Sequence, residues 1–334
     1  MTGTRAGRVT GVEFDDPVLE SAVRSGLDDV EAMLRQSVES ADPFVTEAAS
    51  HLVTAGGKRF RPLLTLLASQ FGEPARAEIV PAAVVVELTH LATLYHDDVM
   101  DEAALRRGTP SANMRWNNTV AILTGDYLFA RASDLLADLG PEAVRIQART
   151  FARLVEGQIR ETVGPAEGAD EVAHYLSVVA DKTGSLIATS GRFGAMFGGA
   201  SAEAVEILTT YGQLIGVAFQ LSDDIIDLVS ETGASGKTPG TDLREGIATL
   251  PVLYALRSDD GAELRSALAA AADGSDDAVA EALSMLRVHP AMAEARATLS
   301  SYADEAKAAV AGLPAGSARR ALETLADFVV ARTG

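Results

Sequence analysis

Apolar residues recur along the chain at intervals of three and four, which is the spacing of one face of an α-helix. Runs of β-branched residues are short, and the strict alternation typical of strands is absent. Prolines stand in the first turns of the apolar segments and glycines at their ends, as expected at helix boundaries. The pattern predicts helices over 16–39, 43–54, 60–72, 76–101, 117–138, 141–163, 170–183, 185–198, 202–230, 247–257, 261–271, 277–286, 290–311 and 316–332.

The predicted fold class is all-α, in the form of a single large helical bundle. No low-complexity linker divides the chain, and no repeat of fixed period is present. We expect residues 1–14 to be a disordered arm and residues 15–334 to form one helical domain. The central helices are apolar nearly all round, which is typical of helices buried in a bundle with functional side chains on their inward faces.

Composition narrows the range of functions. The formal net charge of −19 argues against nucleic acid as a partner. The absence of cysteine excludes disulfides, thiolate metal sites and cysteine nucleophiles. The N-terminal segment lacks the apolar core of a signal peptide. An integral membrane segment is not expected, because the sequence contains no uninterrupted apolar run of about 18 residues. Together these features predict a cytoplasmic protein.

Two segments share the pattern Asp-Asp-x-x-Asp, and each ends an apolar predicted helix. Residues four apart share a helix face, so the outer aspartates of each motif lie side by side and repel one another unless a cation compensates. Mg²⁺ takes one or two carboxylates and completes its coordination with water and substrate phosphate. One such motif alone could be a solvated helix end, but two together favour a metal-dependent diphosphate site. The motifs are Asp97, Asp98 and Asp101, and Asp223, Asp224 and Asp227.

Basic residues gather beside these motifs and near predicted helix ends, although the chain is acidic overall. Helix N-termini with nearby lysine and arginine form anion sites. The sequence around Gly56-Gly57-Lys58 lacks the spacing of a P-loop. Each basic residue could instead be a surface charge, and His90, two helical turns before Asp97, could be structural. The candidates are Lys58, Arg61, Arg106, Arg107, Lys182 and Lys237.

These segments resemble the polyprenyl synthetase family. The resemblance covers most of residues 44–257, while the C-terminal part matches in helical character and in the closing LADFVVAR. It implies the isoprenoid synthase fold, a bundle around a central cavity, and suggests a homodimer. The matching segments are GGKRFRP at 56–62, ELTHLATLYHDDVMDEAALRRG at 87–108, GDYLFARA at 125–132, KTGSL at 182–186, GVAFQLSDDIIDL at 216–228 and GKTPGTDLREGIATLP at 236–251.

The resemblance also implies a reaction. Two or three Mg²⁺ ions bridge the aspartates and an allylic diphosphate, whose ionisation gives a cation that isopentenyl diphosphate attacks. By this resemblance the metal ligands are Asp97, Asp98, Asp101, Asp223 and Asp227. The residues expected to hold isopentenyl diphosphate are Lys58, Arg61, His90 and Arg107. Those expected on the allylic diphosphate are Arg106, Lys182, Thr183, Gln220 and Lys237. The catalytic set comprises Asp97, Asp98, Asp101, Arg106, Lys182, Asp223, Asp224 and Lys237, and residues 233–240 are expected to form a lid.

Product length is expected to depend on the helix before the first motif, where the resemblance places the floor for the growing chain. Leu88, Ala92 and Thr93 are the candidate floor residues. Ala92 leaves the path open where an aromatic residue would close it, and the first motif lacks the two-residue insertion of many short-chain bacterial enzymes. A product longer than geranylgeranyl diphosphate is therefore favoured. Ala92 could instead be an ordinary small residue at a helix–helix contact, and Tyr95 could narrow the path.

Several alternatives remain at this point. A geranylgeranyl or farnesyl diphosphate synthase would carry the same motifs. A class I terpene cyclase normally has a second metal motif of Asn/Ser/Glu type, and a non-catalytic subunit of a heteromeric synthase typically loses aspartates or basic residues. A calcium-binding scaffold would leave the basic residues unexplained. The exact product, the primer, the pathway and the oligomeric state are not readable from the sequence, and a long prenyl product would allow transient contact with a membrane surface.

Overall fold

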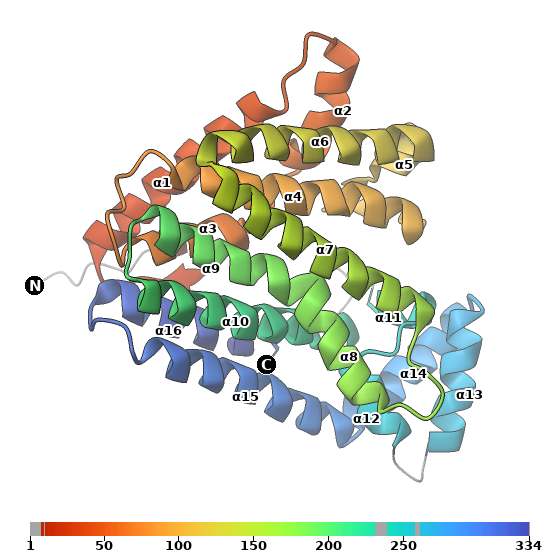
Figure 1. Ribbon diagram of the computed structural model, residues 1–334. Coiled ribbons are helices and arrows are strands. Elements are labelled where there is room, and N and C mark those ends of the chain that lie inside the picture. Colours follow the sequence, from red (N-terminus) through yellow and green to blue (C-terminus); the bar gives the residue numbers. More distant parts are fainter. Residues whose placement is uncertain (1–7, 10, 231–238, 258–260, 334) are drawn as a thin grey trace, which may run out of the picture. The chain divides into compact units, whose positions relative to one another are not determined.

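The computed structural model describes residues 8–9, 11–230, 239–257 and 261–333, and most of these residues are helical (Figure 1). The all-α prediction is confirmed. The elements are β1 (Arg8–Val9), β2 (Val12–Glu13), α1 (Pro17–Ser37), α2 (Pro43–Thr54), α3 (Phe60–Ser69), α4 (Ile79–Met100), β3 (Leu105–Arg106), β4 (Thr109–Pro110), α5 (Ala112–Arg115), α6 (Asn118–Leu139), α7 (Pro141–Val163), α8 (Glu171–Val179), the π-helix η1 (Ala180–Gly184), α9 (Ser185–Phe197), α10 (Ala202–Val229), α11 (Thr241–Arg244), α12 (Leu250–Leu256), α13 (Gly261–Ala272), α14 (Asp276–Val288), α15 (Ala291–Val310) and α16 (Ser317–Ala331).

The helix starts follow from capping residues in the sequence. Asp16 precedes α1, and its carboxylate accepts hydrogen bonds from the backbone N–H groups of Val18 and Leu19 at 2.9 and 3.4 Å. Asp42 caps α2 in the same way through the N–H of Phe44. In both helices proline occupies the first position, where its missing N–H costs nothing.

Six small elements were not predicted: the strands β1 and β2 near the start of the chain, the helices α5 and α11, and the strands β3 and β4. The helices α5 and α11 have four residues each, too few to produce a periodic pattern. The strands β3 and β4 form a hairpin around Arg107 and Gly108, which both have positive φ angles of 54° and 75°. Two positive φ angles in a two-residue loop are typical of a type I′ turn. This hairpin carries two of the predicted site arginines, Arg106 and Arg107.

The chain divides into two compact units. The first comprises Met1–Ala152, Leu186–Gly212 and Lys307–Leu325, and the second comprises Arg153–Ser185, Gln213–Ala306 and Ala326–Gly334. The predicted disordered arm over 1–14 and single domain over 15–334 stay predictions. The first aspartate motif belongs to the first unit and the second motif to the second.

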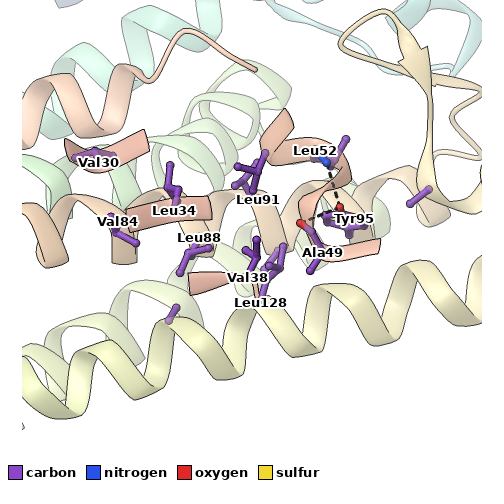
Figure 2. Packing of buried hydrophobic residues seen from close by; sticks show 14 of the residues in the cluster. Val30, Leu34, Val38, Ala49, Leu52, Val84, Leu88, Leu91, Tyr95 and Leu128 are labelled. Atoms are coloured by element: carbon purple, nitrogen blue, oxygen red, sulfur yellow. Dashed lines mark hydrogen bonds between the residues drawn. The ribbon is translucent and has the colours of Figure 1, made fainter. Parts of the chain in front are cut away.

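The core of the first unit is built around α4, which packs along α6 and against α3 and α1 (Figure 1). Figure 2 shows Tyr95 in this core, with hydrogen bonds to the backbone of α2. Its hydroxyl donates to the carbonyl of Ala48 at 2.6 Å and accepts from the N–H of Leu52 at 3.2 Å. These bonds satisfy the buried hydroxyl of Tyr95 and fasten α2 to the helix that carries the first motif.

Helix α4 is apolar around most of its surface and central to the unit. Among the described residues it is the one helix long and apolar enough to cross a membrane by length and composition, and 67% of its apolar window is buried inside the protein. Burial of that extent is expected of a core helix. α6 approaches it closely at Gly125, where a Cβ atom would lie 3.0 Å from the carbonyl oxygen of Ala92.

In the second unit, α13 packs on α14, and α12 contacts α8, α13 and α14. The part of α10 from Gln213 onward belongs to this unit and ends with the second motif. Arg287 of α14 donates from Nε to the carbonyl of Leu228 at 2.7 Å. That contact satisfies a carbonyl that the end of α10 would leave without a helical partner.

Candidate active site

The first aspartate motif occupies the last turn of α4 and does not present its three carboxylates equally. Asp98 is completely buried, and its Oδ1 accepts a hydrogen bond of 2.5 Å from Nε of Arg106. Asp97 is half-buried, and the side chain of Asp101 is 36% exposed, with Oδ2 3.9 Å from Nη2 of Arg106. The outer aspartates therefore lie nearer to solvent, while the middle one holds the hairpin arginine against the helix.

Burial raises the pKa of Asp98, and Arg106 opposes this shift through its charge and its hydrogen bond. Within the described part of the chain, Oδ2 of Asp98 is buried without a hydrogen-bond partner. A buried carboxylate oxygen in that condition is unfavourable unless a cation or a donor reaches it.

The second motif, near the end of α10, is held at each of its aspartates. Asp223 accepts a hydrogen bond from Nη2 of Arg332. Asp224 is 5% exposed, and accepts from the Tyr175 hydroxyl and, at 2.8 Å, from Nε2 of Gln220. Asp227 accepts from the first two backbone N–H groups of α11 at 3.3 and 3.2 Å. Asp227 thus caps the short helix that follows residues 231–238.

Burial raises the pKa of Asp224 to about 7. The hydrogen bonds from Tyr175 and Gln220 lower it, whereas the charges of Asp223 and Asp227 raise it further. The pKa of the Tyr175 hydroxyl is raised well above its ordinary value, by burial first and then by the Asp224 charge. Burial therefore favours the protonated forms of both Tyr175 and Asp224, next to the outer aspartates of the motif.

A π-helix presents the next group of predicted residues. Lys182 and Thr183 lie in η1, a wider turn of a kind that is frequent at functional sites. Nζ of Lys182 lies 2.5 Å from Oε2 of Glu161, and the Thr183 hydroxyl donates to Oε1 of Gln220 at 3.1 Å. Gln220 in turn donates to Asp224. A continuous chain of hydrogen bonds therefore links the π-helix to the second motif.

Two arginines hold this π-helix from α7. Arg153 donates to Oδ1 of Asp181 from Nε at 3.0 Å and from Nη2 at 2.6 Å. Arg160 donates to the other carboxylate oxygen of Asp181. Because Asp181 directly precedes Lys182, these contacts fix the orientation of the turn that carries the predicted site residues.

The basic segment before α3 is organised by Arg59, which the sequence did not single out. Its backbone is left-handed, with φ 47°, and its side chain is 5% exposed. Nη1 lies 2.9 Å from Oε1 of Glu87, Nε contacts Glu31, and Nη2 donates to the carbonyl of Val53 at 3.1 Å. Through these contacts Arg59 anchors the turn that carries Lys58 and Arg61 to the buried residues around it.

Arg107 lies across the same turn. It donates from Nη1 to the carbonyl of Leu52 at 3.1 Å and to that of Gly56. A Cβ atom at Gly57, where φ is 154°, would lie 2.9 Å from Cζ of Arg107. Glycine is required at position 57 both for its backbone angle and for this close contact.

His90 lies among the site arginines of the first unit. Its pKa is lowered well below 6.5 by desolvation and, in decreasing order, by the charges of Arg61, Arg107, Arg106 and Arg59. A histidine in that field stays neutral at physiological pH. The four guanidinium groups act on one ring, so the structure brings together residues that the sequence placed on separate segments.

The predicted floor residues lie on α4. Leu88 is fully buried and Ala92 is 2% exposed, both in the core cluster that includes α6. Thr93 is half-buried, and its hydroxyl donates to the carbonyl of His90 at 2.8 Å. Lys237 and most of the predicted lid lie outside the described residues, so their predictions stay predictions.

A sequence family model described as polyprenyl synthetase matches residues 42–286. The chain belongs to the polyprenyl synthetase family. It is 53% identical over 335 residues to a nonaprenyl diphosphate synthase of Mycobacterium tuberculosis, with 99% of each chain covered.

Solved structures of this family are also similar. A geranylgeranyl pyrophosphate synthase from Corynebacterium glutamicum, complexed with calcium and isoprenyl diphosphate, is 47% identical with a TM-score of 0.85, over 97% of this chain and 100% of that one. A decaprenyl diphosphate synthase from Rhodobacter capsulatus is 35% identical with a TM-score of 0.86, over 95% and 99%. The predicted isoprenoid synthase fold is confirmed.

The donor set of this polyprenyl synthetase suits a hard divalent ion. In the part of the chain that the structure describes, no three His, Asp or Glu side chains converge closely enough to hold a metal by themselves. Each motif nevertheless places two carboxylates one helical turn apart, and Mg²⁺ normally takes one or two carboxylates with water and phosphate oxygens. The buried Oδ2 of Asp98 adds an oxygen whose position a nearby cation would stabilise.

Sequence reasoning missed the residues that hold the predicted site residues of each unit in place. Glu87 lies in a helix that is otherwise strongly apolar, and a carboxylate buried there requires a charged partner. That pattern could have indicated a buried basic residue such as Arg59. Arg59 lies between Lys58 and Arg61, which are the predicted ligand-binding residues of that segment. Tyr175 and Asp181 lie in predicted helix and belong to no motif. Arg332 lies 109 residues from its partner Asp223, beyond the reach of any local pattern.

Proposed function

We propose that this chain is a magnesium-dependent trans-polyprenyl diphosphate synthase, which adds isopentenyl diphosphate units consecutively, head to tail, to an allylic diphosphate. The observation that carries the proposal is the hairpin that sets Arg106 on Asp98 of the first aspartate motif and Arg107 across the glycine turn before Lys58 and Arg61. Such a concentration of cations in an acidic chain favours a polyanionic ligand. The carboxylates favour a second anion bound through metal.

Each group of residues then has a role. Magnesium, when bound, would draw charge from the diphosphate leaving group. The proposed magnesium ligands are Asp97, Asp98, Asp101, Asp223 and Asp227, with two or three ions present when substrate is bound. The proposed ligands of isopentenyl diphosphate are Lys58, Arg61, His90 and Arg107, and those of the allylic diphosphate are Arg106, Lys182, Thr183, Gln220 and Lys237.

The chain itself supplies orientation and exclusion of water. Neutral His90 can donate a hydrogen bond without adding charge, and Arg59 fixes the turn that presents Lys58. Asp227 holds the start of α11 beside the proposed lid. The carbon–oxygen bond of the allylic diphosphate breaks first and pyrophosphate leaves with the electron pair. The double bond of isopentenyl diphosphate then attacks the allylic cation to form the carbon–carbon bond, and a proton is lost to pyrophosphate. Because the allylic cation reacts with water, the apolar helices around it must keep the site dry.

The proposed product is longer than geranylgeranyl diphosphate, such as the precursor of a quinone side chain. Ala92 offers no bulky side chain on α4, and two of the similar proteins are named nonaprenyl and decaprenyl diphosphate synthases. A geranylgeranyl diphosphate synthase is the second candidate, because the Corynebacterium glutamicum protein carries that name at 47% identity.

The proposed assembly is a cytoplasmic homodimer, with transient contact to a membrane surface when a long product is released. Ile122 and Leu123 on α6 are 43% and 61% exposed, and Met114 on α5 is 61% exposed. Adjacent exposed apolar side chains on one helix favour a protein partner. Sedimentation of the purified chain measures this directly, and a monomer would contradict it.

The deciding experiment is incubation of the purified chain with isopentenyl diphosphate, several allylic primers and Mg²⁺, followed by mass analysis. A series of linear diphosphates ending beyond the C20 product is expected. A cyclic hydrocarbon would indicate a terpene cyclase. No elongation with any primer would overturn the proposal and favour a non-catalytic subunit.

A further inference from the structure

The last turn of the chain places a guanidinium group on the second aspartate motif. Arg332 follows α16, and its Nη2 donates to Oδ1 of Asp223. The same guanidinium lies over the ring of Phe219, with Cζ 4.7 Å from the ring centroid. Because Phe219 and Asp223 are four residues apart on α10, ring and carboxylate form one surface that receives the arginine.

This arginine is buried yet incompletely satisfied. Its side chain is 10% exposed, whereas that of Asp223 is 35% exposed. Among the described residues, Nη1 of Arg332 has no hydrogen-bond partner although it is buried. The unused donor leaves the guanidinium able to take a further acceptor, such as a phosphate oxygen, without giving up a hydrogen bond that it already makes.

The chain end around Arg332 is held by further contacts. Thr333 is 6% exposed, its hydroxyl donates to the carbonyl of Val330 at 2.9 Å, and its own carbonyl accepts from Nη2 of Arg296 at 3.5 Å. The guanidinium is therefore delivered to Asp223 by an ordered backbone.

We infer that Arg332 is a built-in competitor for the metal at Asp223, which holds the second motif neutralised until a divalent ion displaces it. The inference rests on the proposed function, since it takes Asp223 to be a metal ligand. A guanidinium donating to Oδ1 occupies the oxygen that a magnesium ion would take, and two cations at one carboxylate repel each other. A metal ion that takes Oδ1 must displace Arg332, which can still rest on Phe219.

This arrangement has a consequence for the order of binding. A metal ion alone must displace the arginine without help. A metal–diphosphate complex also brings phosphate oxygens, which can accept from the released guanidinium. Binding of free metal at Asp223 is therefore weak in the absence of diphosphate, and the second motif takes its ion together with substrate.

The test measures metal binding without substrate, with Mn²⁺ as the probe, by the loss of the free Mn²⁺ signal in electron paramagnetic resonance. Arg332→Gln should bind Mn²⁺ about tenfold more tightly than the unaltered chain, since the loss of one charge-assisted hydrogen bond corresponds to about 1.4 kcal/mol. Arg332→Lys keeps the charge but loses the planar stacking, and should give an intermediate affinity. Arg257→Gln removes an equal charge from an exposed pair with Asp170 in the same unit, and should leave the affinity within about twofold.

Asp223→Asn separates the possible failures. If Asn at 223 weakens Mn²⁺ binding but Arg332→Gln leaves it unchanged or weaker, the competition is refuted while the metal site stands. If Asn at 223 has no effect on Mn²⁺ binding, the metal role of Asp223 in the proposed function fails, and the inference with it. In the double variant the tightening should vanish, and circular dichroism checks that every variant is folded.

Discussion

Replacing Glu87 by glutamine should destabilise the first unit, because the carboxylate is the buried counter-charge of Arg59. Glu87 is 2% exposed and accepts from Nη1 of Arg59 at 2.9 Å. Burial alone would lower the pKa of Arg59, but Glu31 and Glu87 outweigh it and raise that pKa above its ordinary value. The guanidinium of Arg59 therefore stays charged, and its burial is compensated by Glu31 and Glu87 together.

The magnitude follows from what remains after the change. Removing one partner of a buried ion pair costs about 3–5 kcal/mol when the other charge is left alone. Here Glu31 and the Val53 carbonyl still contact Arg59, and a glutamine oxygen can still accept from it. We therefore expect a loss of about 2 kcal/mol in the free energy of unfolding, and a midpoint temperature lower by about 4 °C.

The assay is urea and thermal unfolding followed by circular dichroism, with Glu78→Gln as the matched control. Glu78 lies just before the same helix, and its contact with Arg76 is 3.7 Å long with both side chains more than 40% exposed. Such a surface pair contributes less than about 1 kcal/mol. If Glu87→Gln were no more destabilising than Glu78→Gln, the structural role assigned to the Arg59 pair would be wrong.

Three further predictions test other parts of the first unit. Tyr95→Phe should lower the free energy of unfolding by about 1 kcal/mol, because the contact with Ala48 and Leu52 is lost while those two groups keep their places in helix α2; unchanged urea denaturation would contradict this. His90 should stay neutral at pH 6, and since its folded pKa is lowered, the unfolded chain binds more protons below about pH 6.5, so stability falls as the pH drops through this range. His90→Asn should flatten that dependence, and an imidazole that titrates near its ordinary pKa by NMR would refute the assignment. Ala92→Phe should shift the products to shorter chains, and an unchanged product distribution would exclude Ala92 from the floor.

The sequence was informative where local rules operate. Helical periodicity, with prolines in the first turns and glycines at the ends, located the long helices to within a few residues, and the Asp-x-x-x-Asp spacing placed Asp97 and Asp101 on one turn. It could not show that Asp98 turns inward to Arg106, because helix spacing gives the direction of a side chain but not what covers it.

Long-range contacts account for the rest. The pairing of Arg59 with Glu87 joins residues that no periodicity connects, and a left-handed arginine is not expected from its residue type. The π-helix at Lys182 depends on Asp181 being held from α7, so a plain helix was the natural prediction for 170–183.

The type I′ turn at Arg107 and Gly108 sets adjacent arginines to opposite tasks. Arg106 reaches back to Asp98 at the end of α4, while Arg107 reaches forward to the carbonyls of Leu52 and Gly56. These two consecutive arginines therefore connect the end of α4, which carries the first motif, to the glycine turn. A ligand that moved Arg106 away from Asp98 would also move Arg107 and the carbonyl contacts that it makes. The hairpin therefore couples the end of α4 to the glycine turn before Lys58.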